Sequence, residues 1–291
     1  MSTIWKEIQI KMLHSGSKLN LLIGINILVF LLINVPAVFE TLFFRSSNIA
    51  TLTDEYLLLP ASLHKLLIHF WTPLTYMFMH AGIFHILFNM LWLYWFGQIF
   101  EEYLGKKRTL GLYLMGGFAG AIFFVVSFNT FPFYTYNHAA DLTGPLVGAS
   151  ASVMAIIVAT ATLLPDYTIP LILIGPVKLK WLAIVFVVMD FLGVTGFNAG
   201  GELAHLGGAL IGFIYIKQLQ KGNDMVGNIA KIFKPRPNMK VVASNPSGKS
   251  SGAPRQEEID LILDKISRSG YDSLTKQEKE ILFRASKDNE G

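Results

Sequence analysis

Six apolar runs occupy most of this chain, and each is close to the length that a helix needs to cross a bilayer. They lie within residues 19–39, 70–100, 109–128, 148–164, 181–196 and 203–218. A helix needs about 20 apolar residues to span the hydrocarbon core of a membrane. Because a helix satisfies its own backbone hydrogen bonds, these runs predict an all-α membrane protein with six transmembrane helices.

The composition agrees with a membrane protein and excludes several other classes. Of the 291 residues, 52% are hydrophobic, only 15% are charged, and none is cysteine. Disulfides, thiolate nucleophiles and cysteine-ligated metals are therefore excluded. The first run has 21 residues and no A-x-A-like site after it, so we expect it to be retained as a span.

The positions of Lys and Arg predict the orientation of the spans. They occur in the loops after the second and fourth runs and beyond the sixth, whereas the loops after the third and fifth runs carry none. The positive-inside rule then places both termini in the cytoplasm. The same rule makes the net charge of +4 a sign of topology and not of nucleic-acid binding.

Ser150 stands at the outer start of the fourth run, after Gly148 and Ala149. Free N–H groups and the positive end of the dipole lie at a helix start and suit an oxyanion. A serine among small residues can equally serve helix packing.

His205 lies beside a seam of small residues, Ala204, Gly208 and Gly212, which lets another helix approach closely. If that helix is the fourth run, His205 could accept the proton of Ser150 and make it a nucleophile. The alternative is a histidine that is satisfied at a helix interface.

His80, His85 and Asn89 lie near the outer start of the second run, with His85 and Asn89 on one helix face. A metal site is the weaker interpretation, because there is no HExxH motif and no carboxylate on that face. Hydrogen-bond donors to an oxyanion fit better.

Together these motifs resemble those of the rhomboid family of intramembrane serine proteases. Gly148-Ala149-Ser150-Ala151 resembles its GxSx motif, and the segments from Ala204 to Gly212 and from His80 to Asn89 resemble its AHxxGxxxG and HxxxxHxxxN motifs. Gly97, Glu101, Asp190 and Gly193 also have counterparts, and the resemblance covers about residues 19–218.

The resemblance implies a six-span protein of the bacterial type that cuts transmembrane segments of other membrane proteins. Ser150 would be the nucleophile and His205 the base of a dyad. His85 and Asn89, with the Ser150 N–H group, would form the oxyanion hole, and His80 and Gly148 would support the site. The fifth span and loop 196–202 would form a lateral gate.

The partners implied are membrane-protein substrates and membrane lipids, without a cofactor, metal or nucleic acid. The location implied is the cytoplasmic (inner) membrane of a bacterium, and the oligomeric state stays open. A non-catalytic rhomboid-like protein that binds membrane clients is the alternative. A transporter would predict inverted repeats and charges along an inward path, and neither is seen.

Some residues depart from the family pattern or leave a choice open. Ala151 stands where many members have Gly, and Thr72 follows Trp71 where the family has Arg. Asp190 is expected in mid-span, too deep to orient His205, with a structural or gating role. Ser150 and Ser152 point about 200° apart on a helix, so only one faces His205.

The seam predicts Gly148 and Ser152 as its partner surface on the fourth run. Periodicity alone permits either Ser150 or Ser152 as nucleophile, and the motif resemblance chooses Ser150.

The chain is expected to divide into a cytoplasmic segment 1–18, a membrane domain 19–220, a flexible linker 221–254 and a cytoplasmic helical hairpin 255–291. In the last part, Ile259, Ile262 and Ile266 follow helical spacing. Thr275 and Glu278 have the spacing of a capping box. So small a hairpin buries little core, which favours docking or self-association.

Overall fold

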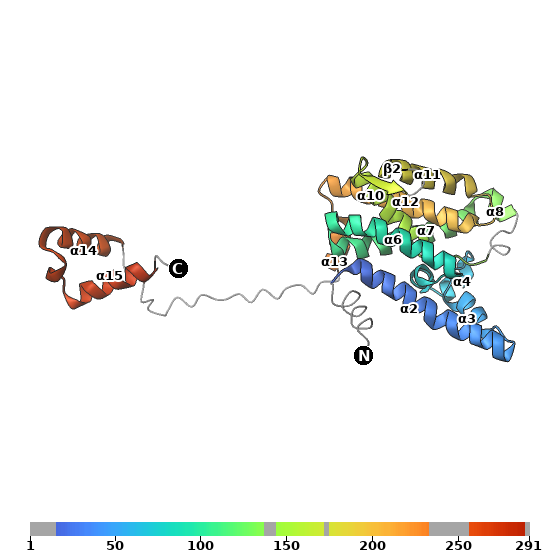
Figure 1. Ribbon diagram of the computed structural model, residues 1–291, viewed down its shortest axis with the longest axis horizontal. Coiled ribbons are helices and arrows are strands. Elements are labelled where there is room, and N and C mark those ends of the chain that lie inside the picture. Colours follow the sequence, from blue (N-terminus) through green and yellow to red (C-terminus); the bar gives the residue numbers. More distant parts are fainter. Residues whose placement is uncertain (1–15, 137–143, 172–174, 233–255, 289–291) are drawn as a thin grey trace. The chain divides into compact units, whose positions relative to one another are not determined.

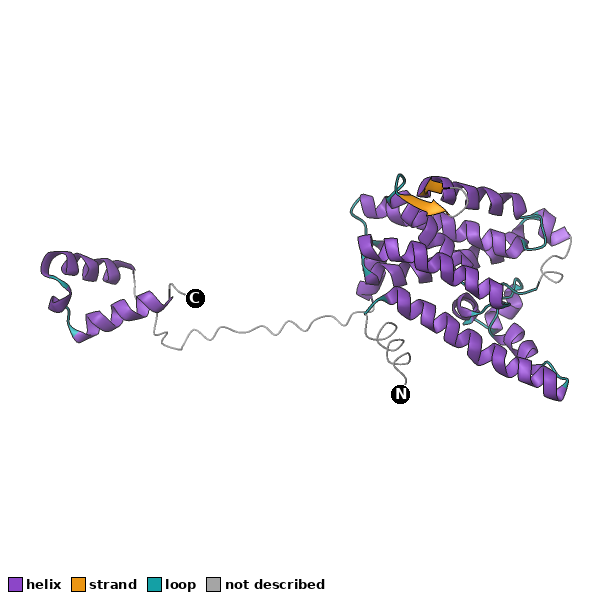
Figure 2. Cartoon of the chain, in the orientation of Figure 1, coloured by secondary structure: helices purple, strands orange, loops and turns teal. Residues whose placement is uncertain are grey.

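Helices make up nearly all of the regular structure in the computed structural model, which describes residues 16–136, 144–171, 175–232 and 256–288 (Figure 1; Figure 2). The chain divides into two units, Met1–Lys234 and Pro235–Gly291. The long helices of the first unit are α2 (Lys18–Phe39), α6 (Ile83–Leu104), α7 (Lys106–Thr130) and α12 (Ala199–Gln220). Its shorter helices are α3 (Asn48–Tyr56), α4 (Leu63–Ile68), α5 (Thr72–Thr75), α8 (Pro132–Tyr136), α10 (Ser150–Leu163), α11 (Leu179–Gly193) and α13 (Met225–Ile232).

Four helices of the described residues are long and apolar enough to cross a membrane, whereas the sequence predicts six. A π-helical turn (Glu40–Phe44) extends α2, which gives spanning lengths of 27, 22, 25 and 22 residues for α2, α6, α7 and α12. With a rise of 1.5 Å per residue, the 14 residues of α10 cover only about 21 Å.

The segment before α10 explains why that helix is short. Leu146 exchanges two backbone hydrogen bonds with Leu59 in an isolated β-bridge. The Gly148 N–H donates to the carbonyl of Tyr76 at 3.0 Å. These contacts to distant residues hold the segment extended, so that the helix begins only at Ser150.

A small sheet is an exception to the all-α prediction. Strands β1 (Thr168–Leu171) and β2 (Gly175–Lys178) pair antiparallel, with Thr168 opposite Lys178. Prolines at 170 and 176 disfavour a helix here. The hairpin occupies the residues just before α11, which therefore starts at Leu179 and has 15 residues.

Helix α10 forms the centre of the bundle, since every residue from Ala151 to Ala161 is buried. It packs against α6, α7, α11 and α12. A Cβ atom at Gly208 would lie 2.1 Å from the carbonyl oxygen of Ala151, so the backbones of α12 and α10 approach as closely as glycine allows. The predicted partner surface of this seam, Gly148 with Ser152, is therefore wrong, because Gly148 precedes the helix.

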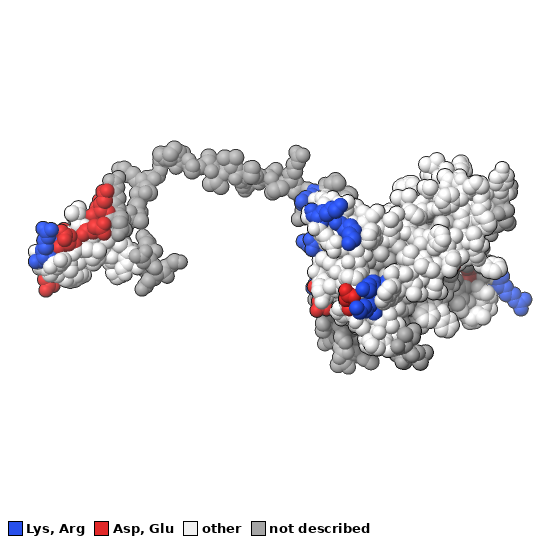
Figure 3. All heavy atoms as spheres, turned by 90° about the horizontal axis from the view of Figure 1, so that it is seen from above, with Lys and Arg blue, Asp and Glu red and all other residues white. Residues whose placement is uncertain are grey.

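The outer surface of the helical unit is apolar, as expected for helices that face lipid. Figure 3 shows a broad face without charged side chains, with most of the Lys and Arg at one end and a smaller group at the other. Helix α11 in particular exposes Ile184, Val188, Met189 and Leu192. Such a surface is typical of membrane proteins.

Between α2 and α6 the chain forms short helices that hold Trp71 and Thr72 in place. The Trp71 indole N–H donates to the Tyr56 carbonyl at 2.7 Å, and the Thr72 hydroxyl donates to the His69 carbonyl at 2.8 Å. Thr72 is fully buried. This part of the loop is thus packed without the arginine of the family pattern.

Part of the predicted flexible linker is helical. Helix α13 packs against α7, where Val226 is buried over Gly111 and Arg108 forms a 2.9 Å ion pair with Asp224. The rest of the linker, 233–254, and residues 1–15 of the N-terminal segment lie outside the described residues, as do residues 255 and 289–291 of the predicted hairpin.

The second unit contains α14 (Gln256–Ser269), a 3₁₀ turn (Tyr271–Ser273) and α15 (Lys276–Asp288). The Glu278 carboxylate accepts hydrogen bonds from the backbone N–H and the hydroxyl of Thr275, and from the ammonium group of Lys265 at 2.9 Å. The predicted capping box is therefore formed, and an ion pair links it to α14.

Candidate functional site

Ser150 and His205 line one cavity of about 870 Å³ in the membrane unit. Its walls come from α6, from residues 144–150 and from the start of α12 with the turn before it. No hydrogen bond within the described residues joins the Ser150 hydroxyl to His205. Such contacts often tighten only when a substrate binds, so the shared cavity is the relevant observation.

Ser152 points elsewhere. Its side chain is fully buried, and its hydroxyl lies 2.9 Å from where a Cβ atom at Gly117 of α7 would be. Ser152 does not line the cavity, whereas Ser150 does. Of the two serines that periodicity leaves open, only Ser150 therefore shares a cavity with His205.

His85 faces the same point as Ser150. The Ala81 N–H donates to His85 Nδ1 at 3.3 Å, which places the ring proton of a neutral His85 on Nε2. A Cβ atom at position 148 would lie 2.8 Å from His85 Nε2 and 3.5 Å from Ser150 Oγ. Gly148 has a φ of +127°, which only glycine adopts readily.

Asn89 lies one turn further along α6 and also lines the cavity. Its Nδ2 atom donates to the His85 carbonyl at 2.9 Å, as an i to i−4 contact. An amide nitrogen carries two protons, so one N–H remains for a ligand. His85 and Asn89 can thus both present donors to one space beside Ser150.

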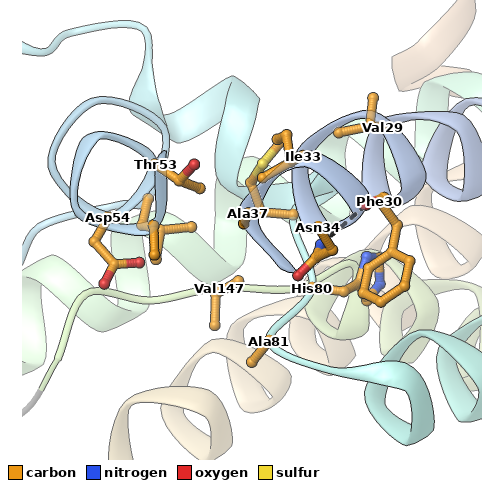
Figure 4. Close-up of a pocket in the computed structure, with 13 residues that line it drawn as sticks. Val29, Phe30, Ile33, Asn34, Ala37, Thr53, Asp54, His80, Ala81 and Val147 are labelled. Atoms are coloured by element: carbon orange, nitrogen blue, oxygen red, sulfur yellow. Dashed lines mark hydrogen bonds between the residues drawn. The ribbon is translucent and has the colours of Figure 1, made fainter. Parts of the chain in front are cut away.

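His80 is set back from this cavity. Its ring packs edge-on against His85 with centroids 5.2 Å apart. It lines a second cavity of about 240 Å³, bounded by α2, α3 and Val147, with Asn34 and Phe30 beside it (Figure 4). Neither ring nitrogen has a hydrogen-bond partner in the described residues. The ring contact with His85 therefore links His80 to the site.

Asp190 contacts His205, contrary to the sequence prediction. Asp190 Oδ1 lies 2.9 Å from His205 Nδ1. The prediction of mid-span depth failed because α11 ends at Gly193, which places Asp190 in its last turn. The short turn to α12 then brings the ends of the two helices together.

Glu202 is a second carboxylate that sequence reasoning missed. Its Oε1 atom lies 2.4 Å from where a Cβ atom at Gly193 would be, so this carboxylate packs over the last residue of α11. Its position three residues before His205, on the same face of α12, is the signal that could have found it. No group of three or more His, Asp or Glu side chains in the described ranges is arranged to hold a metal.

The predicted gate, loop 196–202, is shorter than expected, because α12 already begins at Ala199. The turn before α12 carries Phe197, which is fully exposed, and the Tyr134 hydroxyl donates to the Val194 carbonyl. Further along, Trp92 of α6 meets Phe186 of α11 with ring centroids 5.2 Å apart. Trp92 and Phe197 line the cavity of Ser150, and the contact of Trp92 with Phe186 ties α6 to α11 beside it.

Comparison with known proteins places this arrangement in a family. The model of the rhomboid domain matches residues 68–221, more than half of the chain, and a family of unknown function matches residues 250–288. Presenilin-associated rhomboid-like protein A, mitochondrial, from Danio rerio is 34% identical over 48% of this chain and 35% of its own length. RHOMBOID-like protein 12, mitochondrial, from Arabidopsis thaliana is 32% identical over 52% of this chain and 47% of its own length.

RHOMBOID-like protein 1 from Arabidopsis thaliana is 30% identical over 64% of this chain and 42% of its own length. The chain thus spans less than half the length of these relatives. Two of them are named as mitochondrial, so they lend no support to the predicted bacterial inner membrane.

Proposed function

Because this chain belongs to the rhomboid family, we propose that it is an intramembrane serine endopeptidase that cleaves transmembrane segments of other membrane proteins. The observation that carries the proposal is the convergence of Ser150, His205, His85 and Asn89 on one cavity within a membrane bundle. Each comes from the start of a different helix or from one face of α6, so the fold and not the local sequence brings them together.

The reaction would follow the chemistry of a serine nucleophile and a histidine base. Ser150 Oγ attacks the scissile carbonyl while His205 takes its proton, and His205 then passes that proton to the leaving amine. The Nε2–H of His85, the free N–H of Asn89 and the backbone N–H of Ser150 stabilise the oxyanion. Water then hydrolyses the acyl-enzyme by the same route in reverse.

The proposal includes the topology. Helices α10 and α11 cross the membrane with the four longer spans, because extended residues 144–149 complete the path of α10 and the β1–β2 hairpin precedes α11. By the Lys and Arg bias both termini lie in the cytoplasm. The cavity then opens toward the outer leaflet, where a substrate helix would enter between α6 and α11.

A fluorophosphonate probe tests the nucleophile directly. The purified protein in detergent should be labelled and should cleave a transmembrane reporter peptide, and Ser150→Ala and His205→Ala should each abolish cleavage. Because the two residues act as one unit, the double variant should be no worse than either. Ser152→Ala is the matched control and should keep both labelling and cleavage.

Labelling that survives in Ser150→Ala would contradict the assignment. A folded wild-type protein that binds membrane clients but neither reacts with the probe nor cleaves would instead support the non-catalytic alternative.

A further inference from the structure

Asp190 and His205 lie at ion-pair distance from each other inside a membrane bundle. The two side chains are only 13% and 20% exposed, and Oδ1 and Nδ1 lie 2.9 Å apart. They come from separate helices, α11 and α12, on either side of a short turn. The packing of two helices therefore forms this contact, which is not one between neighbouring turns of a single helix.

The position of Asp190 is costly, which argues that it serves a purpose. It lies in the last turn of α11, where the negative end of the helix dipole disfavours an anion. Charged residues within membrane segments are rare because taking a charge out of water is costly, and those that occur are usually functional. Its second oxygen is buried and has no hydrogen-bond partner in the described ranges. Among the residues that the structure describes, His205 is the hydrogen-bond partner of this carboxylate.

The contact with Asp190 determines the tautomer and the ring orientation of His205. An ionised carboxylate can only accept hydrogen bonds, so Nδ1 must carry the proton. The lone pair of a neutral His205 is then on Nε2, the nitrogen that remains for the Ser150 hydroxyl, and the ring is held in one orientation. The same carboxylate would stabilise the imidazolium that forms once the proton has moved.

We propose that Asp190 is a positioning residue that holds His205 in the tautomer and orientation of a general base, so that the site works as a Ser150–His205–Asp190 arrangement. This inference rests on the protease function proposed above. It assigns no contact with substrate to Asp190, which acts through His205.

Glu202 provides a matched control for the proposal. It is a partly buried carboxylate that packs over the end of α11, three residues before His205, but it makes no hydrogen bond to His205 in the described structure. Neutralising it removes a neighbouring charge without removing the Nδ1 contact. The pair of variants Asp190→Asn and Glu202→Gln therefore separates hydrogen-bond geometry from the local field.

The first measurement is the steady-state cleavage of a transmembrane reporter. Asp190→Asn should lower kcat by ~10- to 10⁴-fold, because an amide can donate to Nδ1 and favour the wrong tautomer. KM should stay within about twofold, since substrate contacts are unchanged. Asp190→Glu should recover part of the loss, and Glu202→Gln should stay within about threefold of wild type. Thermal unfolding checks that every variant is folded.

The second measurement does not depend on protease activity. A two-bond ¹H–¹⁵N spectrum of ¹⁵N-histidine protein in micelles, at alkaline pH, reports which ring nitrogen carries the proton. His205→Gln assigns the signal among the seven histidines. The wild type should show protonated Nδ1 for His205, and Asp190→Asn should shift the proton toward Nε2.

The outcomes separate the two proposals. An active wild type whose Asp190→Asn variant keeps full kcat, or whose His205 tautomer does not change, overturns the positioning role alone. An equal loss in Glu202→Gln overturns it as well, because charge and not the contact would then matter. An inactive wild type with an intact Nδ1–H signal overturns the protease function, and the role of Asp190 in catalysis with it.

Discussion

Around Gly148, two polar atoms converge on a space that only glycine leaves open. A side chain at this position would stand between His85 Nε2 and Ser150 Oγ, at 2.8 Å from the former. The positive φ of +127° adds backbone strain for any other residue. Two physical reasons thus favour glycine at position 148: its positive φ, and the space that a side chain would take from the cavity.

Gly148→Ala should therefore lose at least ~10²-fold in kcat, because the methyl group displaces a donor from the oxyanion site. Backbone strain should also lower the free energy of unfolding by about 1–3 kcal/mol. Gly144→Ala is the control, since a Cβ atom there meets nothing within 4 Å. Steady-state kinetics and thermal unfolding measure both effects, and a fully active Gly148→Ala protein would refute this account.

Asn89→Ala should lower kcat by ~10²- to 10³-fold, the cost of one lost oxyanion donor. Residual cleavage should remain, because His85 and the Ser150 N–H still donate. Asn34→Ala is the matched control. Its amide makes the same i to i−4 contact, to Phe30 at 3.0 Å, but lines the other cavity. Equal rates in Asn89→Ala and wild type would remove Asn89 from the site.

The sequence predicts those site residues that belong to short motifs. The spacing of His85 and Asn89 and the seam beside His205 place these residues on helix faces. The contact of Asp190 could not be read in this way, because its depth depends on where α11 ends. A run of apolar residues does not mark that end, whereas the turn at 194–198 sets it.

At the scale of elements, the packing of α12 on α10 holds the nucleophile and the base together. The closest approach is at Gly208, over the carbonyl of Ala151. Gly208→Val should force the helices apart and lower the free energy of unfolding by about 1–3 kcal/mol or more. It should also reduce fluorophosphonate labelling. Leu210→Val, on the exposed side of α12, is the control and should change neither.

The α14–α15 hairpin should depend on pH through Glu278. The hydrogen bond from the Lys265 ammonium group, with those from Thr275, lowers the pKa of Glu278 to about 2. Unfolded, this pKa is about 4.3. The contribution is therefore fully present above the unfolded pKa and is lost as pH falls through the folded pKa.

Hydrogen exchange of amides 256–288 in the full chain measures this contribution. At pH 7, Glu278→Gln should exchange faster than wild type, and the two should converge near pH 2. A difference that is unchanged by pH would rule out the ionised carboxylate as its source. Glu257→Gln, which carries none of these contacts in the described residues, is the control.

The long spans could be predicted because each is a continuous apolar run. The start of α10 could not, since the bridge between Leu146 and Leu59 joins residues far apart in the sequence. The sequence also does not predict helix α13. It is short and follows polar residues 220–224, and its place is set by contacts with α7, where Val226 lies over Gly111 and Arg108 pairs with Asp224.

For the whole molecule, the boundary between the two units predicts what can be removed. A chain that ends at Lys234 keeps α13 and should cleave a detergent-solubilised substrate with unchanged kcat. A chain that ends at Gly222 loses the Arg108–Asp224 ion pair and buried Val226, and should unfold at a lower temperature. Loss of catalysis in the folded 1–234 chain would show that the second unit takes part in the reaction.

The unequal lengths of the lipid-facing helices have a consequence for the bilayer itself. Figure 1 shows α2 and α11 at opposite edges of the bundle. The 27 residues that begin with α2 reach about 40 Å, whereas the 15 residues of α11 reach about 22 Å. With α11 crossing the membrane as proposed, lipid beside it would meet a negative hydrophobic mismatch and would be compressed there. Client helices with a short apolar length would then gather at this thinned wall, on the side of the entry path proposed between α6 and α11.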